Sequence, residues 1–107
     1  MATYTPDRWV VLELGTRGSE PIRKVFGGWY GGYLNGDSWK LSSGITNVRE
    51  FDDRWEFDNY SGSIYVCYKT GGYGMSGYMT SLYTSWQKEA EESPDVSIKV
   101  VDEYDRT

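Results

Sequence analysis

The sequence predicts an α+β domain in which one amphipathic helix, near residues 76–92, packs on one face of a mostly antiparallel sheet of about five to seven strands. Three observations lead to this class. Apolar residues alternate along several short segments, turn-forming residues separate those segments, and one later segment changes to a helical period. Since 107 residues suffice for one hydrophobic core, we expect a single domain over residues 1–107.

Two hairpins are predicted in the first half of the chain. Apolar residues alternate over residues 9–14 and again over 22–26, and the connection between them is rich in turn formers. The dipeptide Asn35-Gly36 lies between segments 29–34 and 37–41, and Asn-Gly supplies the positive φ angles of a two-residue type I′ turn. We therefore expect two antiparallel strand pairs.

The middle of the chain is predicted to be a meander. Strand-like segments cover residues 46–51, 54–57 and 63–69, and only short turns separate them. Parallel neighbours would need a crossover connection of about a dozen residues, so these strands should pair antiparallel.

The helix is predicted from a change of period. One stripe of a helix collects Met79, Leu82, Tyr83, Trp86 and Ala90. Ser76 is a suitable N-cap and Pro94 ends the segment, which leaves an acidic last turn in an unfavourable position relative to the helix dipole. Apolar residues alternate again over 96–100 as a final strand, and we expect the tail 102–107 to be frayed.

The net charge of −5 is unevenly distributed along the chain. Residues 50–58 hold five carboxylates and one arginine, a net charge of −4, and residues 88–107 hold seven carboxylates and three cations, also −4. Nucleic-acid binding requires a basic surface that displaces counterions, so direct binding of nucleic acid is not expected. A basic surface on a protein partner fits this charge better.

Several classes of function are disfavoured by composition. Cys67 is the single cysteine and histidine is absent, which excludes an internal disulfide and a zinc site of four cysteines, and removes the commonest metal ligand and general base. We therefore expect no catalytic residues, no metal and no cofactor. The chain shows no signal-peptide pattern and no membrane-spanning run, so a cytoplasmic location without membrane contact is expected.

The acidic segment 50–58 is the first candidate for a partner surface. On a strand, alternate residues would share one solvated face, where Arg54 compensates part of the charge. Aromatic residues lie close by, and tyrosine and tryptophan often carry binding energy at interfaces. The candidate contact residues are Asp52, Asp53, Trp55, Glu56, Asp58 and Tyr60.

Glycine-rich loops with embedded aromatic residues are the second candidate. Five Trp, ten Tyr and three Phe exceed what one sheet and one helix stripe need in a chain of this size. The loop 71–77 joins a strand to a helix, where free amides could hold an anion, and Arg23, Lys24 or Arg49 could add charge. Glycines that merely permit bends remain the alternative. The candidate residues for a small anionic ligand or nucleotide are Trp29, Tyr30, Tyr33, Lys69, Tyr73, Gly74, Ser76 and Tyr78.

The chain resembles, in general character, the small accessory proteins that bacteriophages encode, including anti-CRISPR and other anti-defence inhibitors. The likeness rests on a short acidic chain, an aromatic-rich sheet, one helix and the absence of a catalytic set, and it covers no motif. It implies a non-catalytic inhibitor that docks a basic surface of a host defence or nucleic-acid-processing protein in the host cytosol. A small-ligand binder or ligand sponge is the alternative, and a homo-oligomer would fit it.

Overall fold

The computed structural model describes residues 2–32 and 36–106, and within them the chain forms eight strands and one long helix. In chain order the elements are β1 (Thr3–Tyr4), β2 (Arg8–Thr16), β3 (Ile22–Trp29), β4 (Ser38–Leu41), β5 (Ile45–Glu50), β6 (Arg54–Asn59), β7 (Ile64–Tyr68), α2 (Gly77–Glu91) and β8 (Val96–Val101). The predicted α+β class is confirmed. The strands, however, divide into two sheets, a division that the sequence analysis did not predict.

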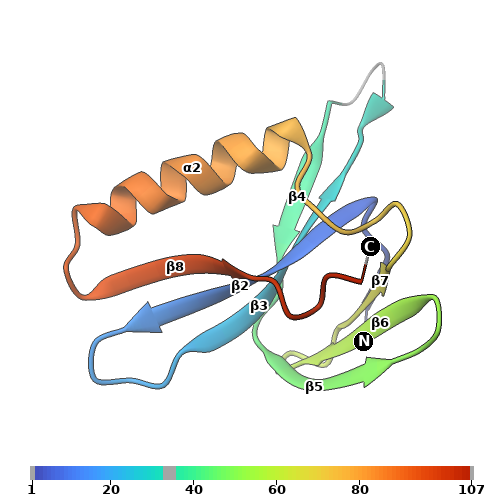
Figure 1. Ribbon diagram of the computed structural model, residues 1–107, viewed down its shortest axis with the longest axis horizontal. Helices are drawn as coiled ribbons and strands as arrows, with labels where there is room; N and C mark the ends of the chain where they lie inside the picture. The colour runs from blue at the N-terminus through green and yellow to red at the C-terminus, as the bar shows by residue number, and fades with distance from the viewer. Residues whose placement is uncertain (1, 33–35, 107) are drawn as a thin grey trace.

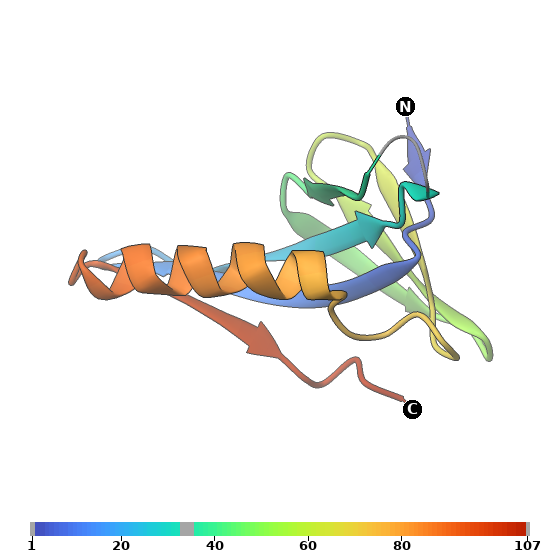
Figure 2. The ribbon, with the colours of Figure 1, turned by 90° about the horizontal axis from the view of Figure 1, so that it is seen from above.

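The two sheets have four strands each. The long sheet has the order β4-β3-β2-β8, and the meander sheet has the order β1-β7-β6-β5. Helix α2 lies along the long sheet, while the meander sheet packs against the opposite face and only at one end of it (Figures 1 and 2). The far end of the long sheet, formed by the β2–β3 hairpin and the start of β8, therefore has α2 on one face and no second sheet on the other.

Strand β2 is buried on both faces because its neighbouring residues serve two different cores. Trp9 and Val11 point toward the meander sheet, where they pack with Phe57 and other fully buried residues. Val10 and Leu12 point toward the helix and pack with Phe26, Met79 and neighbours. A strand covered on both sides reads as a continuous apolar run, as residues 9–12 do.

Helix α2 is held most closely at its N-terminal end. The Ser76 hydroxyl caps this end and accepts a hydrogen bond from the Met79 amide (3.2 Å). Met79 is fully buried against Gly28, where an added Cβ would lie 2.5 Å from the methionine sulfur. Glycine at this position of β3 thus lets the first turns of the helix approach the sheet. The predicted helix, 76–92, is confirmed with its caps.

Most predicted strands are confirmed in position and pairing. The first hairpin pairs Val11 with Val25, the meander β5-β6-β7 is antiparallel throughout, and β8 completes the long sheet beside β2. The second hairpin was predicted wrongly in its first strand: Tyr30 to Gly32 are not in a strand, and β4 pairs instead with the end of β3, with Trp29 opposite Ser38. The predicted Asn35-Gly36 turn includes Asn35, which lies outside the described residues.

Two features near the chain ends differ from the expectations. The short strand β1 pairs parallel with β7, with Thr3 opposite Ile64, although no strand was expected there. The segment after β8, expected to be frayed, instead brings Tyr104 into the core, where the indole N–H of Trp55 donates to the Tyr104 carbonyl (3.1 Å). Tyr104, together with ion pairs of Glu103 with Arg23 and of Arg106 with Glu50, therefore anchors a segment that was expected to be frayed.

Candidate functional site

The acidic strand predicted as a partner surface is β6, and its outward face is neutralised by two arginines. Glu56 accepts from Arg49 (3.1 Å) and from Arg54 (2.8 Å), and Arg49 also contacts Asp58 at 2.7 Å. The Asn47 amide and the Arg49 guanidinium hold the pKa of Asp58 below its usual value. These carboxylates already have cationic partners within the chain, which reduces their attraction for an external one.

The remaining residues of that candidate surface do not form one patch. Trp55 was predicted to contact a partner, but its side chain points into the core and the residue is only 6% exposed. Asp52 and Asp53 lie in the turn before β6, where Asp53 pairs with Arg54 (2.8 Å). Tyr60, 86% exposed, follows the opposite end of β6. The inward direction of Trp55 follows from strand alternation, since Phe57 and Asn59 are buried on the same face.

The glycine-rich loop 71–77 uses several of its polar backbone groups in a short parallel bridge to β2 at Trp9. The Trp9 amide donates to the Gly72 carbonyl (3.0 Å), and the Gly74 amide donates to the Trp9 carbonyl (2.8 Å). Tyr73 packs edge-on against the Trp9 ring, with 5.0 Å between ring centroids. Burial, with Asp105 and Asp102 nearby, raises the pKa of Tyr73. This loop is therefore built as a packed connection, and the Ser76 hydroxyl already occupies the helix N-cap.

The other predicted ligand residues lie in separate places. Trp29 is half-buried and its indole N–H donates to the Thr5 carbonyl (3.0 Å). Lys69 belongs to the meander sheet side, where it contacts Glu50 at 2.7 Å. Tyr30 and Tyr78 are exposed, and Tyr33 lies outside the described residues. Lys69, the cation predicted for an anion site, therefore already has a carboxylate partner.

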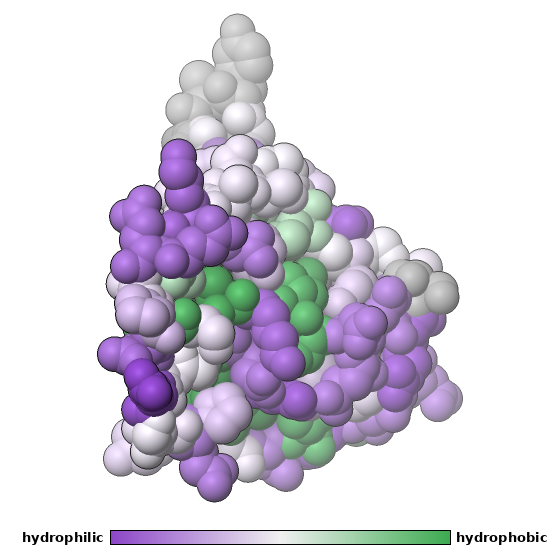
Figure 3. All heavy atoms as spheres, turned by 60° about the vertical axis from the view of Figure 1, so that its left-hand side comes forward, coloured by the Kyte–Doolittle hydropathy of each residue, from purple (hydrophilic) through white to green (hydrophobic). Residues whose placement is uncertain are grey.

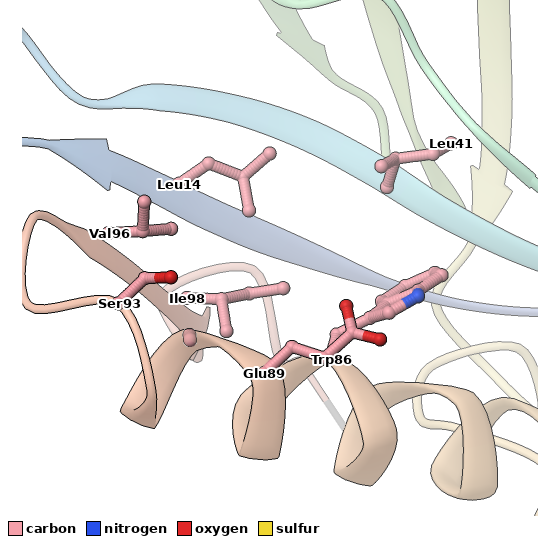
Figure 4. A pocket seen from close by; sticks show the side chains of 8 residues that line it. Leu14, Leu41, Trp86, Glu89, Ser93, Val96 and Ile98 are labelled. Carbon is pink, nitrogen blue, oxygen red and sulfur yellow. The ribbon is translucent and has the colours of Figure 1, made fainter.

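An apolar groove lies instead between the C-terminal half of α2 and the far end of the long sheet. Its volume is about 350 Å³. The residues that line it are Leu14, Leu41, Trp86, Glu89, Ala90, Ser93, Val96 and Ile98. Figure 4 shows the side chains of Leu14, Val96 and Ile98 projecting from the strands, with Trp86 and Glu89 projecting from the helix. Trp86 and Ala90 were predicted to lie on the core-facing stripe of the helix, and no groove was predicted there.

The groove stays open because the last turns of the helix present small side chains to the sheet. Met79 fills the space at the N-terminal end, whereas Ala90 stands at the corresponding position three turns later. Val96 is 45% exposed as a result. Figure 3, which turns this end of the molecule toward the viewer, shows hydrophobic atoms in a hollow between hydrophilic ones. An exposed apolar hollow with a polar rim is typical of an interaction site.

Carboxylates stand on both sides of the helix end. Glu89 lines the groove, and Glu91 lines a second hollow of about 230 Å³ on the other side of Ala90, with Glu92 directly after. Within residues 2–32 and 36–106, none of these three carboxylates forms an ion pair. Negative charge at a helix C-terminus is unfavourable to the helix dipole, so local stability does not explain this cluster.

The sequence contained a signal for this groove. Along the core-facing stripe of α2 the side chains become smaller, from Met79 and Trp86 to Ala90. On β8, by contrast, the alternate residues that face the helix, Val96 and Ile98, are still large and apolar. Where the helix presents only small side chains to large apolar side chains on the facing strand, part of the apolar surface of the strand stays uncovered. This apolar surface lies beside the acidic last turn of α2. The carboxylates of the acidic segment on β6 are not among the residues that line the groove.

The described residues, 2–32 and 36–106, contain neither a cluster of metal ligands nor a membrane-spanning helix. No group of three or more His, Cys, Asp or Glu side chains that could hold a metal ion occurs in this part of the chain. None of its helices combines the length and the apolar character needed to cross a bilayer. Comparisons with protein-family models, with curated proteins and with solved structures gave no match to this chain.

Proposed function

We propose that this chain is a non-catalytic binding protein whose groove beneath α2 receives a basic, amphipathic segment of a partner protein. The observation that carries the proposal is the apolar groove, about 350 Å³, under a helix end with three carboxylates that lack ion pairs in the described part of the chain. Apolar side chains of the partner would enter the groove, and its lysines or arginines would meet Glu89, Glu91 and Glu92.

The proposal retains the predicted basic partner and moves its contact from β6 to the helix end. On β6, Arg49 and Arg54 already pair with Glu56 and Asp58. A carboxylate that is already in an ion pair attracts an external cation less strongly, and Glu89, Glu91 and Glu92 form no ion pair in the described part of the chain.

The kind of partner follows from the resemblance to small phage-encoded inhibitors. We propose that the basic segment belongs to a host defence or nucleic-acid-processing protein, since such proteins carry lysine- and arginine-rich surfaces for phosphate backbones. An acidic protein that covers such a surface would block it stoichiometrically. The aromatic and acidic composition of the chain suits this role.

The direct test measures binding of two peptides of about 14 residues with the same helical leucine pattern, one with lysine and one with glutamate at the remaining positions. Trp86 lines the groove, so its fluorescence should report occupancy, and a Trp86→Phe variant identifies that contribution among the five tryptophans. We expect the lysine peptide to bind, with affinity that falls as salt rises, and the glutamate peptide to bind at least about tenfold more weakly.

Variants locate the contact on the protein. Removing charge with Glu89→Gln, Glu91→Gln and Glu92→Gln together should weaken the lysine peptide about tenfold, and Ala90→Trp should block the groove. Asp52→Asn with Asp53→Asn is the control in the other acidic segment and should leave affinity within about twofold. Equal binding of the two peptides, or a larger loss in the Asp52 and Asp53 variant, would contradict the proposal. Self-association that Ala90→Trp abolishes would identify a second copy as the occupant instead.

A further inference from the structure

Another pocket lies beside Ser42 and Ser43, in the connection from β4 of the long sheet to β5 of the meander sheet. Figure 1 shows the course of this connection. Its volume is about 300 Å³. The lining residues are Tyr4, Lys24, Lys40, Leu41, Ser42, Ser43, Ser61, Ser63 and Tyr65. No carboxylate lines it, although the chain has sixteen acidic residues against eleven basic ones. The pocket is thus locally basic in an acidic protein.

The two lysines of this pocket have no anionic partner in the described part of the chain. Seven of the eleven cations form ion pairs there, and Lys24 and Lys40 are among the four that do not. The Lys40 ammonium lies over the Tyr4 ring, 5.1 Å from its centroid, and Tyr4 also lines the pocket. This cation–π contact holds one positive charge at the pocket without neutralising it.

Hydroxyl groups of the pocket have protons left to donate. The Ser43 hydroxyl accepts a hydrogen bond from the Ser61 amide (3.0 Å), so its own proton is not used in that bond. The hydroxyls of Ser61 and Ser63 lie 3.1 Å apart, and one of them donates to the other. The second proton of this pair remains available. At least two hydroxyl donors therefore line the pocket together with Lys24 and Lys40.

We propose that this pocket binds the phosphate group of a small phosphorylated molecule or free phosphate. A phosphate offers three or more oxygens and up to two negative charges, which match two lysines and two hydroxyl donors better than the two oxygens of a carboxylate do. Burial raises the pKa of Tyr65 to about 12, so this residue adds no competing negative charge at neutral pH.

This site is separate from the groove beneath α2 and does not depend on the function proposed for it. Leu41 lines both hollows, and every other lining residue belongs to one of them. Leu41 is therefore left unchanged in both sets of variants. A failure of phosphate binding leaves the groove untouched, and a failure of the peptide test leaves the lysine pocket untouched.

The test titrates the full chain with inorganic phosphate, with glycerol phosphate as a soluble phosphomonoester, and with acetate, and follows backbone amide signals by NMR. We expect saturable shifts at Ser43 and over residues 61–63 with either phosphate probe, and binding of acetate at least about tenfold weaker. Tighter binding of glycerol phosphate assigns the pocket to a phosphorylated small molecule, and tighter binding of inorganic phosphate assigns it to the free ion.

Matched lysine variants decide whether the pocket is responsible. Lys24→Met and Lys40→Met should each weaken phosphate about tenfold. Lys88→Met, which removes the same charge from a helix lysine outside the pocket, should change affinity less than about twofold. Ser61→Ala offers a variant that keeps both lysines, and it should also weaken phosphate. Absence of saturable shifts up to about 10 mM phosphate, equal binding of acetate, or equal losses in all three lysine variants would overturn the proposal.

Discussion

The meander side and the helix side of the long sheet differ in how completely their apolar side chains are buried and their carboxylates are paired. Toward the meander sheet, Trp9, Phe57 and Tyr65 are sealed from solvent, and the carboxylates on the outer face of β6 meet arginines. Toward the helix, Met79 is sealed, but the layer opens into a groove beyond Trp86. The long sheet therefore packs against the meander sheet without leaving these apolar side chains exposed, whereas its packing against α2 leaves apolar side chains in contact with solvent.

This difference indicates where a partner can gain free energy. A sealed core offers no surface, and a paired carboxylate must lose its internal partner before it gains another. The groove offers apolar area that is still in contact with water, and the carboxylates of Glu89, Glu91 and Glu92 have no cation to release in the described chain. A bound partner would bury the apolar area and pair the carboxylates on the helix side, as other parts of the chain already do on the meander side.

The largest expected effect compares truncation in the two layers. Phe57→Ala removes a ring with no exposed surface and should lower the free energy of unfolding by about 3–5 kcal/mol. Trp86→Ala removes a ring that packs on Phe26 and Trp39 but borders the groove, and it should cost about half as much, because solvent already reaches it. Urea denaturation of both variants measures the difference. Equal losses would mean that the helix layer is as sealed as the meander layer.

A smaller effect tests the paired carboxylates of β6. Contacts with Asn47 and Arg49 lower the pKa of Asp58 in the folded protein, so Asp58 stabilises the fold above its unfolded pKa of about 3.9, and this contribution is lost as pH falls through the folded pKa. Asp58→Asn should therefore cost about 0.5–1 kcal/mol near pH 7, and the difference from wild type should vanish in strongly acidic solution. Denaturation curves at pH 7, 5 and about 3 check the trend. A cost that persists unchanged at the lowest pH would contradict charge pairing as its cause.

The sequence predicted the elements far better than it predicted their layers. Local periodicity located α2 within a residue at each end and identified the meander, because side-chain spacing is set by the backbone within one element. The division into two sheets depends on where the chain crosses between β4 and β5, and on the short parallel pair of β1 with β7. Both are contacts between segments distant in sequence, which periodicity does not report.

For the candidate sites as well, the sequence predicted features within one strand and not contacts between distant segments. Alternation predicted that Arg54 would share a face with Glu56 and Asp58, and the ion pair with Glu56 forms there. It also implied that Trp55 faces the other side of β6, away from the carboxylates with which it was predicted to share a partner surface. The groove and the lysine pocket each combine residues from segments far apart in the chain. Sites of this kind become visible only when the strand order is known.

The smallest expected effect concerns the acidic helix end, and its sign is opposite to that of the other substitutions. Replacing Glu91 and Glu92 by glutamine removes negative charge from the C-terminal end of α2, where the helix dipole disfavours it. The variant should be more stable than wild type by about 0.3–1 kcal/mol in low salt, and the gain should shrink as salt rises. Thermal denaturation at two salt concentrations measures it, with Glu20→Gln in the exposed β2–β3 turn as the control.

A gain in stability together with weaker binding of the lysine peptide would mean that Glu91 and Glu92 serve recognition at a cost to the stability of the helix. A loss of stability would instead reveal an internal role for them and remove them from the binding site.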